Sequence, residues 1–253
     1  NGHVTEILMP FSPKEFSMRW DHVRTMIQER SLEALVLSSP ETIYYLTNYQ
    51  TPGNPLTVLI IPADRSLEPC ILTRELECTN ARYRSTTKYK VYLEDDTPEE
   101  GIASHLASVM PRAGVAGEAR LVGFEANSAR LTVGSQRAIE RDLEARFQRA
   151  RQLRFDAERQ TNDIVKGTAP LAVVADTSDT SAPVPVVWED VSPFFIKIRN
   201  CKSEQEIEYV TKAAAYTLEG IRAAVAAMRP GIRETEVVSF APRARFIRMH
   251  LRP

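Results

Sequence analysis

The sequence predicts an α/β fold, in which a mixed β-sheet is flanked by helices and followed by one long helix. Two patterns predict this fold. Between residues 34 and 147, short apolar segments of strand length alternate with amphipathic segments of helical period, and from residue 203 to 228 an apolar stripe repeats at steps of three and four. The composition, 43% hydrophobic and 26% charged in 253 residues, is that of a globular protein with one large or two small domains.

A first helix is predicted at residues 12–30. Ser12 is the expected N-cap, Pro13 takes the first helical position, and Glu15 completes a capping box. The helix then carries one apolar stripe at steps of four, three and four, formed by Phe16, Trp20, Val23 and Ile27.

Five strands are predicted at residues 34–38, 56–61, 70–73, 90–93 and 121–125. The helices expected between and after them cover residues 42–47, 74–83, a segment introduced by the acidic run 94–100, and 129–147. The strand at residues 56–61 is apolar throughout, which places it in the interior of the sheet.

Residues 156–190 are predicted to be an inserted loop or linker, because Ser, Thr, Asp and Pro crowd together and helical periodicity disappears. A second capping box, formed by Ser203 and Glu206, then begins the long helix. Residues 234–240 are expected to begin another helix before an arginine-rich tail. Its four arginines favour either a soluble chain end or a basic amphipathic contact with anionic lipid or a partner.

Charge and cysteine usage narrow the protein class. With 32 basic and 33 acidic side chains, the net charge of -1 gives the whole chain no basic field for nucleic-acid binding. The longest apolar run, residues 56–61, is much shorter than the roughly 18 to 20 residues of a membrane span, so no membrane association is predicted. No secretory signal is read at the start of the sequence, and three cysteines form no paired framework. A cytoplasmic location is therefore predicted.

Motifs for catalysis are not found. The sequence contains no HExxH, P-loop, GxGxxG or GxSxG pattern, and its four histidines are scattered singly, which favours surface or packing roles for them. No catalytic and no metal-binding residue is therefore predicted. The acidic run 94–100 is interpreted as a helix start rather than a cation site, and Asp176 and Asp179 as loop residues rather than metal ligands.

An aromatic cluster precedes the Gly/Pro-rich segment that follows residue 50. Tyr45 is expected in the core with its neighbours Ile43 and Leu46, whereas Tyr49 and Gln50, at the mouth of the loop, are the candidates for contact with a ligand.

Three segments together resemble the N-terminal domain of the creatinase and Xaa-Pro aminopeptidase family: RWDHVRTMIQERSLEALVLSSPETIYYLTNY, LTVLIIPADRSLEPCILTRELE and VGFEANSARLT. A fourth, DVSPFFIKIRNCKSEQEIEYV with the helix after it, resembles the junction to the catalytic domain of that family. The resemblance covers about residues 9–149 and 191–238. It implies a domain at residues 9–200 with the polar insertion at 156–190, and a junction helix with the start of a truncated catalytic domain at residues 201–253.

Enzymes of this family hold two divalent ions such as Mn, Co or Zn in a pita-bread C-terminal domain. None of the metal-ligand positions can be assigned in this chain, so no cofactor is expected in it. The family's usual G-x-T-E after the junction helix reads Gly231-Ile232-Arg233-Glu234 here, with arginine at the capping position.

The resemblance implies a non-catalytic N-terminal portion of a metallohydrolase, inactive alone, which contributes dimer contacts and the mouth of an active site. It implies a homodimer that meets a peptide or small amide substrate only together with a catalytic domain. Tyr49, Gln50 and Asn54 are the expected substrate-binding residues. The alternative is a stand-alone, non-catalytic protein-binding module of the same fold.

Overall fold

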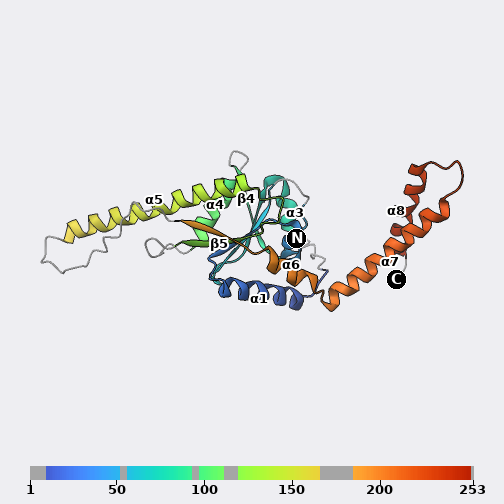
Figure 1. The fold of residues 1–253 in the computed structure, drawn as a ribbon, viewed down its shortest axis with the longest axis horizontal. Coiled ribbons are helices and arrows are strands. Elements are labelled where there is room, and N and C mark those ends of the chain that lie inside the picture. The colour runs from blue at the N-terminus through green and yellow to red at the C-terminus, as the bar shows by residue number, and fades with distance from the viewer. Residues whose placement is uncertain (1–9, 52–55, 93–96, 111–118, 166–184, 252–253) are drawn as a thin grey trace, which may run out of the picture. The chain divides into compact units, whose positions relative to one another are not determined.

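The computed structural model describes residues 10–51, 56–92, 97–110, 119–165 and 185–251 (Figure 1). The chain divides into two compact units, one that ends at Ile196 and one that begins at Lys197. Each unit is described by itself.

The first unit is built on a six-stranded sheet with the strand order β4-β3-β2-β1-β5-β6. Only β2 runs antiparallel to its neighbours β1 and β3, whereas the β3–β4, β1–β5 and β5–β6 pairs are parallel. The predicted mixed α/β sheet is therefore confirmed. The strands are β1 (Ala34–Leu37), β2 (Val58–Pro62), β3 (Cys70–Arg74), β4 (Lys88–Tyr92), β5 (Arg120–Phe124) and β6 (Val186–Asp190).

Helices cover both faces of this sheet. In Figure 1, α4 and α5 lie over one face and α1 lies over the other. The helices of the unit are α1 (Pro13–Glu29), α2 (Pro40–Thr47), the 3-10 turn η1 (Glu75–Glu77), α3 (Cys78–Arg84), α4 (Pro98–Val109), α5 (Val133–Val165) and the start of α6 (Ser192–Asn200).

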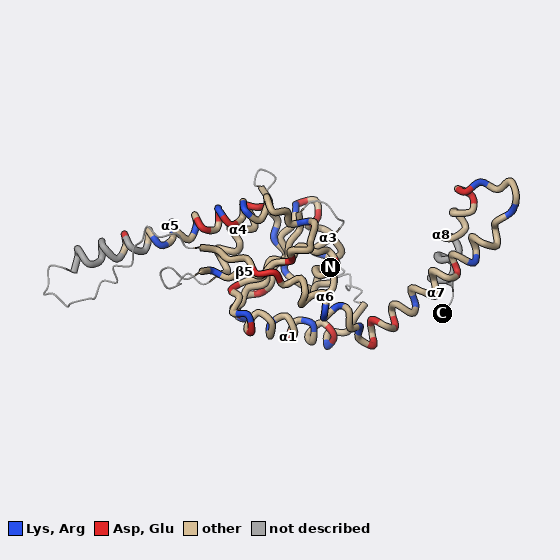
Figure 2. The backbone as a smooth tube through the Cα atoms, in the orientation of Figure 1, with Lys and Arg blue, Asp and Glu red and all other residues tan. Residues whose placement is uncertain are grey.

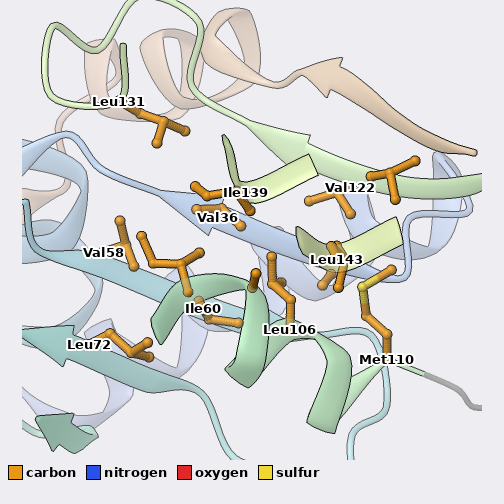
Figure 3. Close-up of a cluster of buried hydrophobic side chains, with 14 of the residues drawn as sticks. Val36, Val58, Ile60, Leu72, Leu106, Met110, Val122, Leu131, Ile139 and Leu143 are labelled. Atoms are coloured by element: carbon orange, nitrogen blue, oxygen red, sulfur yellow. The ribbon is translucent and has the colours of Figure 1, made fainter. Parts of the chain in front are cut away.

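The core under α4 and α5 is continuous (Figure 3). Val36, Ile60 and Val122 of the central strands pack there with Leu106 of α4 and Leu143 of α5. Because side chains alternate along a strand, the neighbouring buried residues of β1 point to the opposite face, toward α1.

The predicted loop at residues 156–190 is wrong at both ends. Helix α5 continues to Val165, and β6 begins at Val186. Between residues 156 and 165 this helix holds only Ala157, Ile164 and Val165 among polar residues, so it carries no continuous apolar stripe that marks a helix in the sequence. Strand β6 is a short segment that owes its conformation to parallel pairing with β5. Residues 166–184, which include Asp176 and Asp179, and the acids at 94–96 lie outside the described residues.

The second unit contains α7 (Glu204–Ala227) and α8 (Glu234–Leu251), which pack against each other. Both N-cap hydrogen bonds of the predicted capping box are present, since Glu206 N donates to Ser203 Oγ and Ser203 N donates to Glu206 Oε2. Helix α8 passes through Pro242, so the described part of the tail is helical rather than separate from the predicted helix. In the part of the chain that the structure describes, no helix has the length and apolarity needed to cross a membrane.

Candidate functional site

The candidate site begins where α2 ends, at residues 47–50, which we name the loop base. Asn48 closes the helix in the left-handed conformation, with φ 58°, and its N–H donates to the carbonyl of Tyr44 at 2.9 Å. Asparagine tolerates this conformation better than most residues. The chain therefore turns sharply and brings Tyr49 and Gln50 against η1 and α3.

Tyr49 is fully buried at the loop base. Its N–H donates to Thr47 Oγ1 at 3.2 Å, and its phenol lies 3.5 Å from Glu77 Oε2, in position to donate to that carboxylate. Burial raises the pKa of the Tyr49 phenol, and the nearby Glu77 carboxylate adds to the rise. Tyr49 is consequently a neutral hydrogen-bond donor near neutral pH.

Gln50 shows the opposite arrangement, because its backbone is held and its side chain is exposed. Its carbonyl accepts a hydrogen bond from Asn80 Nδ2 at 3.1 Å, and the same amide lies 3.4 Å from Glu77 Oε2. Asn54, the third predicted binding residue, lies outside the described residues. The structure thus brings Tyr49 and Gln50 to one place and presents only the Gln50 side chain to solvent.

Further hydrogen bonds connect the loop base to the segment after α3. The N–H of Thr86 donates to the carbonyl of Thr47 at 2.9 Å, and Asn48 Nδ2 donates to the carbonyl of Arg84 at 3.2 Å. Since both α3 and the turn before β4 bind the loop base, its backbone position is set by the sheet domain rather than by the loop itself.

A second polar cluster lies at the carboxyl ends of β1 and β5, where sequence reasoning placed no functional residue. Glu125 is only 2% exposed. Its Oε2 accepts hydrogen bonds from the N–H groups of Ser38 and Ser39, at 3.2 and 3.0 Å, and its Oε1 accepts from Thr42 Oγ1 at 2.6 Å. A carboxylate in this position accepts hydrogen bonds from N–H groups at the start of α2. Its negative charge also interacts favourably with the positive end of the α2 dipole.

Asp190 has the same role at the carboxyl end of β6. Its Oδ1 accepts hydrogen bonds from the N–H groups of Ser192 and Ala126, at 2.8 and 3.2 Å. Although partial burial acts to raise the pKa of Asp190, the hydrogen bonds from Ser192 and Ala126 outweigh it and lower the pKa. The signal in the sequence is an acid directly after a strand, close to a Ser-Pro helix start, but the sequence does not show which helix start each acid reaches.

The carboxyl edge of the parallel strands, where α/β proteins commonly bind ligands, is therefore occupied by two carboxylates that bind backbone N–H groups. Among the described residues, no three His, Cys, Asp or Glu side chains are grouped in a way that could hold a metal ion. The feature of the site that is open to a ligand is the exposed Gln50 on a fixed backbone.

Comparison with known proteins identifies what this fold is similar to. The family model described as the creatinase/prolidase N-terminal domain matches residues 19–155. No curated protein matches the chain.

Among solved structures, the prolidase from Pyrococcus horikoshii superposes with a TM-score of 0.60 at 12% identity, over 91% of this chain and 49% of its own. The prolidase from Pyrococcus furiosus superposes with a TM-score of 0.58 at 15% identity, over 90% of this chain and 52% of its own. The Xaa-Pro dipeptidase from Bacillus anthracis superposes with a TM-score of 0.57 at 14% identity, over 92% of this chain and 49% of its own. The chain thus spans about half the length of the structures that it matches.

Proposed function

Because the chain belongs to the creatinase/prolidase N-terminal domain family, we propose that it is the non-catalytic N-terminal portion of a metallohydrolase of the creatinase or Xaa-Pro aminopeptidase type. The observation that carries the proposal is the match of an N-terminal domain model to residues 19–155. The likeness to prolidase folds over about half of their length supports it. The chemistry of the whole enzyme, hydrolysis of a peptide or small amide with two divalent ions such as Mn, Co or Zn, belongs to the other half.

In this proposal the loop base forms part of the mouth of an active site. Gln50 contacts substrate through its exposed amide, and Asn54 adds a second contact with substrate. Tyr49 is buried and holds the backbone of the loop base in place. The hydrogen bond from Asn80 to the Gln50 carbonyl supports this role, since a side chain that selects substrate needs a fixed backbone.

The proposed assembly is a homodimer in the cytoplasm. Support for self-association comes from α7, where apolar side chains are exposed, among them Ile207, Val210, Ile221, Val225 and Met228. Support for a reducing compartment comes from Cys70, Cys78 and Cys201, which are all free thiols.

The first test is an assay of the purified chain on an Xaa-Pro dipeptide with Mn(II) or Co(II), together with calorimetric titration of the same ions. We expect no hydrolysis above the metal blank and no stoichiometric binding. Turnover by the chain alone, or tight uptake of about two ions, would overturn the proposal.

The mouth is tested in a chimera that joins this domain to the catalytic half of the Pyrococcus furiosus prolidase. Once the unmodified chimera is shown to be active, Gln50→Ala is expected to raise KM several-fold and leave kcat nearly unchanged. Gln28→Ala, which changes an exposed glutamine on α1, is the matched control. Equal kinetic constants for all three chimeras would remove Gln50 from the mouth.

The exposed apolar residues of α7 also favour the alternative, a stand-alone protein-binding module. Sedimentation velocity over a range of concentrations separates the two readings. A homodimer has about twice the 28.5 kDa mass of the chain. A concentration-independent monomer that captures another protein at one-to-one stoichiometry favours the binding module.

A further inference from the structure

A pocket of about 360 Å³ lies on the first unit, and one of its lining residues, Thr86, donates a hydrogen bond to Thr47 of the loop base. Trp20 and Arg24, one helical turn apart on α1, form one wall. The other side is formed by the segments that lead into β3 and β4, with Glu68, Pro69, Thr87 and Lys88. The volume lies within the range typical of small-molecule sites.

Arg24 is the main positive charge of this pocket, and the charge of Asp64 acts on it. It is half-buried, its Nη1 donates to the carbonyl of Pro62, and within the described part of the chain it forms no ion pair. Burial lowers the pKa of the Arg24 guanidinium, and the neighbouring positive charge of Arg65 lowers it further. Asp64, the acid that acts in the opposite direction, is itself exposed and accepts the N–H of Ser66.

The remaining polar groups of the pocket include hydrogen-bond donors that are not used. The indole N–H of Trp20 and the hydroxyl of Thr87 make no hydrogen bond with a described residue, and Arg24 uses one of its five N–H groups on Pro62. Lys88 is paired with Glu68, which leaves that part of the rim neutral. Unused donors next to a cation that forms no ion pair with a described residue complement an anion rather than a second cation.

The wall opposite α1 is held rigidly. Ser85 Oγ accepts from the N–H of Thr87 at 2.9 Å and donates to the carbonyl of Thr87 at 3.0 Å. The N–H of Thr86 donates to the carbonyl of Thr47 at 2.9 Å. A ligand that enters this pocket therefore does not need to order this part of its wall, which reduces the entropic cost of binding.

We propose that this pocket binds a small organic anion in which a carboxylate or phosphate is attached to a flat apolar group. The anionic oxygens accept hydrogen bonds from Arg24 and Thr87, and the apolar group packs against the Trp20 indole and the Pro69 ring. None of residues 47–50 lines the pocket, but its wall residue Thr86 hydrogen-bonds to Thr47 of the loop base.

The two tryptophans of the chain provide a direct readout, since Trp20 lines the pocket and Trp188 lies on β6. In the Trp188→Phe variant the Trp20 indole alone emits on excitation near its red edge. We expect saturable changes in emission on titration with phenyl phosphate and with benzoate. Neutral benzamide and inorganic phosphate are expected to bind more weakly, because each lacks one half of the recognised ligand.

The charge is tested with Arg24→Gln in the same background, which is expected to weaken binding of benzoate and phenyl phosphate about tenfold. Arg137→Gln, an exposed arginine on α5, is the matched control and is expected to change nothing. Circular dichroism establishes folding of both. If Arg24→Gln does not fold, the fall in affinity of the Trp188→Phe variant with added salt tests the same contact.

Several outcomes overturn the proposal: no saturable change with either anion, equal affinity in the Arg24→Gln variant, or no salt dependence. Benzamide that binds as tightly as benzoate would remove the anion from the recognised ligand. Inorganic phosphate that binds as tightly as phenyl phosphate would remove the flat apolar group.

Discussion

Helices α4 and α7 begin in the same way and are buried very differently. Each starts with a complete capping box, from Thr97 and Glu100 in α4 and from Ser203 and Glu206 in α7. Helix α4 then buries four side chains, whereas Gly220 is the single buried residue of α7. The comparison shows that capping residues determine where a helix begins, while the packing partner determines how much the helix contributes to stability.

The surroundings explain the difference. Helix α4 packs on the sheet beside α5 and contributes to the core shown in Figure 3. Helix α7 packs on α8, and most of its apolar stripe remains exposed. Figure 2 shows positions of Lys, Arg, Asp and Glu along α7, and its apolar stripe is a surface that a partner or a second copy can cover.

The largest expected effect comes from emptying the core position of α4. Leu106 is fully buried, so Leu106→Ala is expected to reduce the free energy of unfolding by about 3–4 kcal/mol. Ile221 on α7 is 52% exposed, and Ile221→Ala is expected to change the free energy of unfolding by no more than about 0.5 kcal/mol. Urea unfolding followed by circular dichroism, which reports the helices of both units, measures the difference.

The result also tests whether α7 is exposed in solution. A loss for Ile221→Ala as large as that for Leu106→Ala would mean that α7 is covered by another surface at the protein concentration used. In that case the loss should shrink on dilution, because association depends on concentration.

The next effect concerns the buried carboxylate at the start of α2. Glu125→Ala leaves the N–H groups of Ser38 and Ser39 and the hydroxyl of Thr42 without their acceptor, and it is expected to cost about 3 kcal/mol. Glu125→Gln keeps one acceptor oxygen and should cost less. Glu75→Ala, at an exposed acid, is the control. A Glu125→Ala protein as stable as the Glu75→Ala protein would show that water replaces the carboxylate at no cost.

Glu125 also shows where prediction from the sequence ends. Local signals identified the capping box at Ser203, and apolar segments of strand length identified five of the six strands. The hydrogen bond from Ser38 to Glu125 joins residues 87 positions apart, and no local pattern contains it. Strand β6 was missed for the same reason, because it becomes a strand through pairing with β5.

For the candidate site, the sequence placed Tyr49 and Gln50 at a loop mouth, and the structure distinguishes them. Tyr49 carries a hydroxyl that donates to Glu77, but its ring is buried. Aromatic residues occur both in pockets and in cores, so composition does not separate the two roles. Only the fold, in which Asn80 and Glu77 meet the loop base, shows which side chain faces solvent.

A smaller effect is expected on the pH dependence of stability, through His105 on α4. Burial, together with the charge of Lys90, lowers the pKa of His105 from 6.5 to about 4. Its folded-state pKa lies below the unfolded value, so the neutral ring contributes stability that is complete above pH 6.5 and is lost as the pH falls toward 4. The expected loss is on the order of 2–3 kcal/mol over this range.

His105→Gln isolates this contribution from the acids that titrate in the same range. Denaturation between pH 7 and pH 4 should show a flatter decline for His105→Gln than for the unmodified chain, and an unchanged decline for His22→Gln, whose residue is exposed on α1. Parallel curves for all three proteins would mean that the His105 ring gains a proton at no cost to folding.

The smallest expected effect is the loss of the N-cap hydrogen bond in each of the two helices. The N–H groups of Glu100 and Glu206 donate to the hydroxyls of Thr97 and Ser203. Thr97→Ala and Ser203→Ala remove these hydrogen bonds, and each lowers the stability of its own helix by about 1 kcal/mol. Since α4 is part of the core, Thr97→Ala should lower the free energy of global unfolding by that amount. Ser203→Ala should leave global unfolding of the first unit unchanged and accelerate amide hydrogen exchange in the first turns of α7. Equal shifts in global unfolding would show that the two units unfold together, and α7 would then have to be stabilised by contacts beyond those with α8.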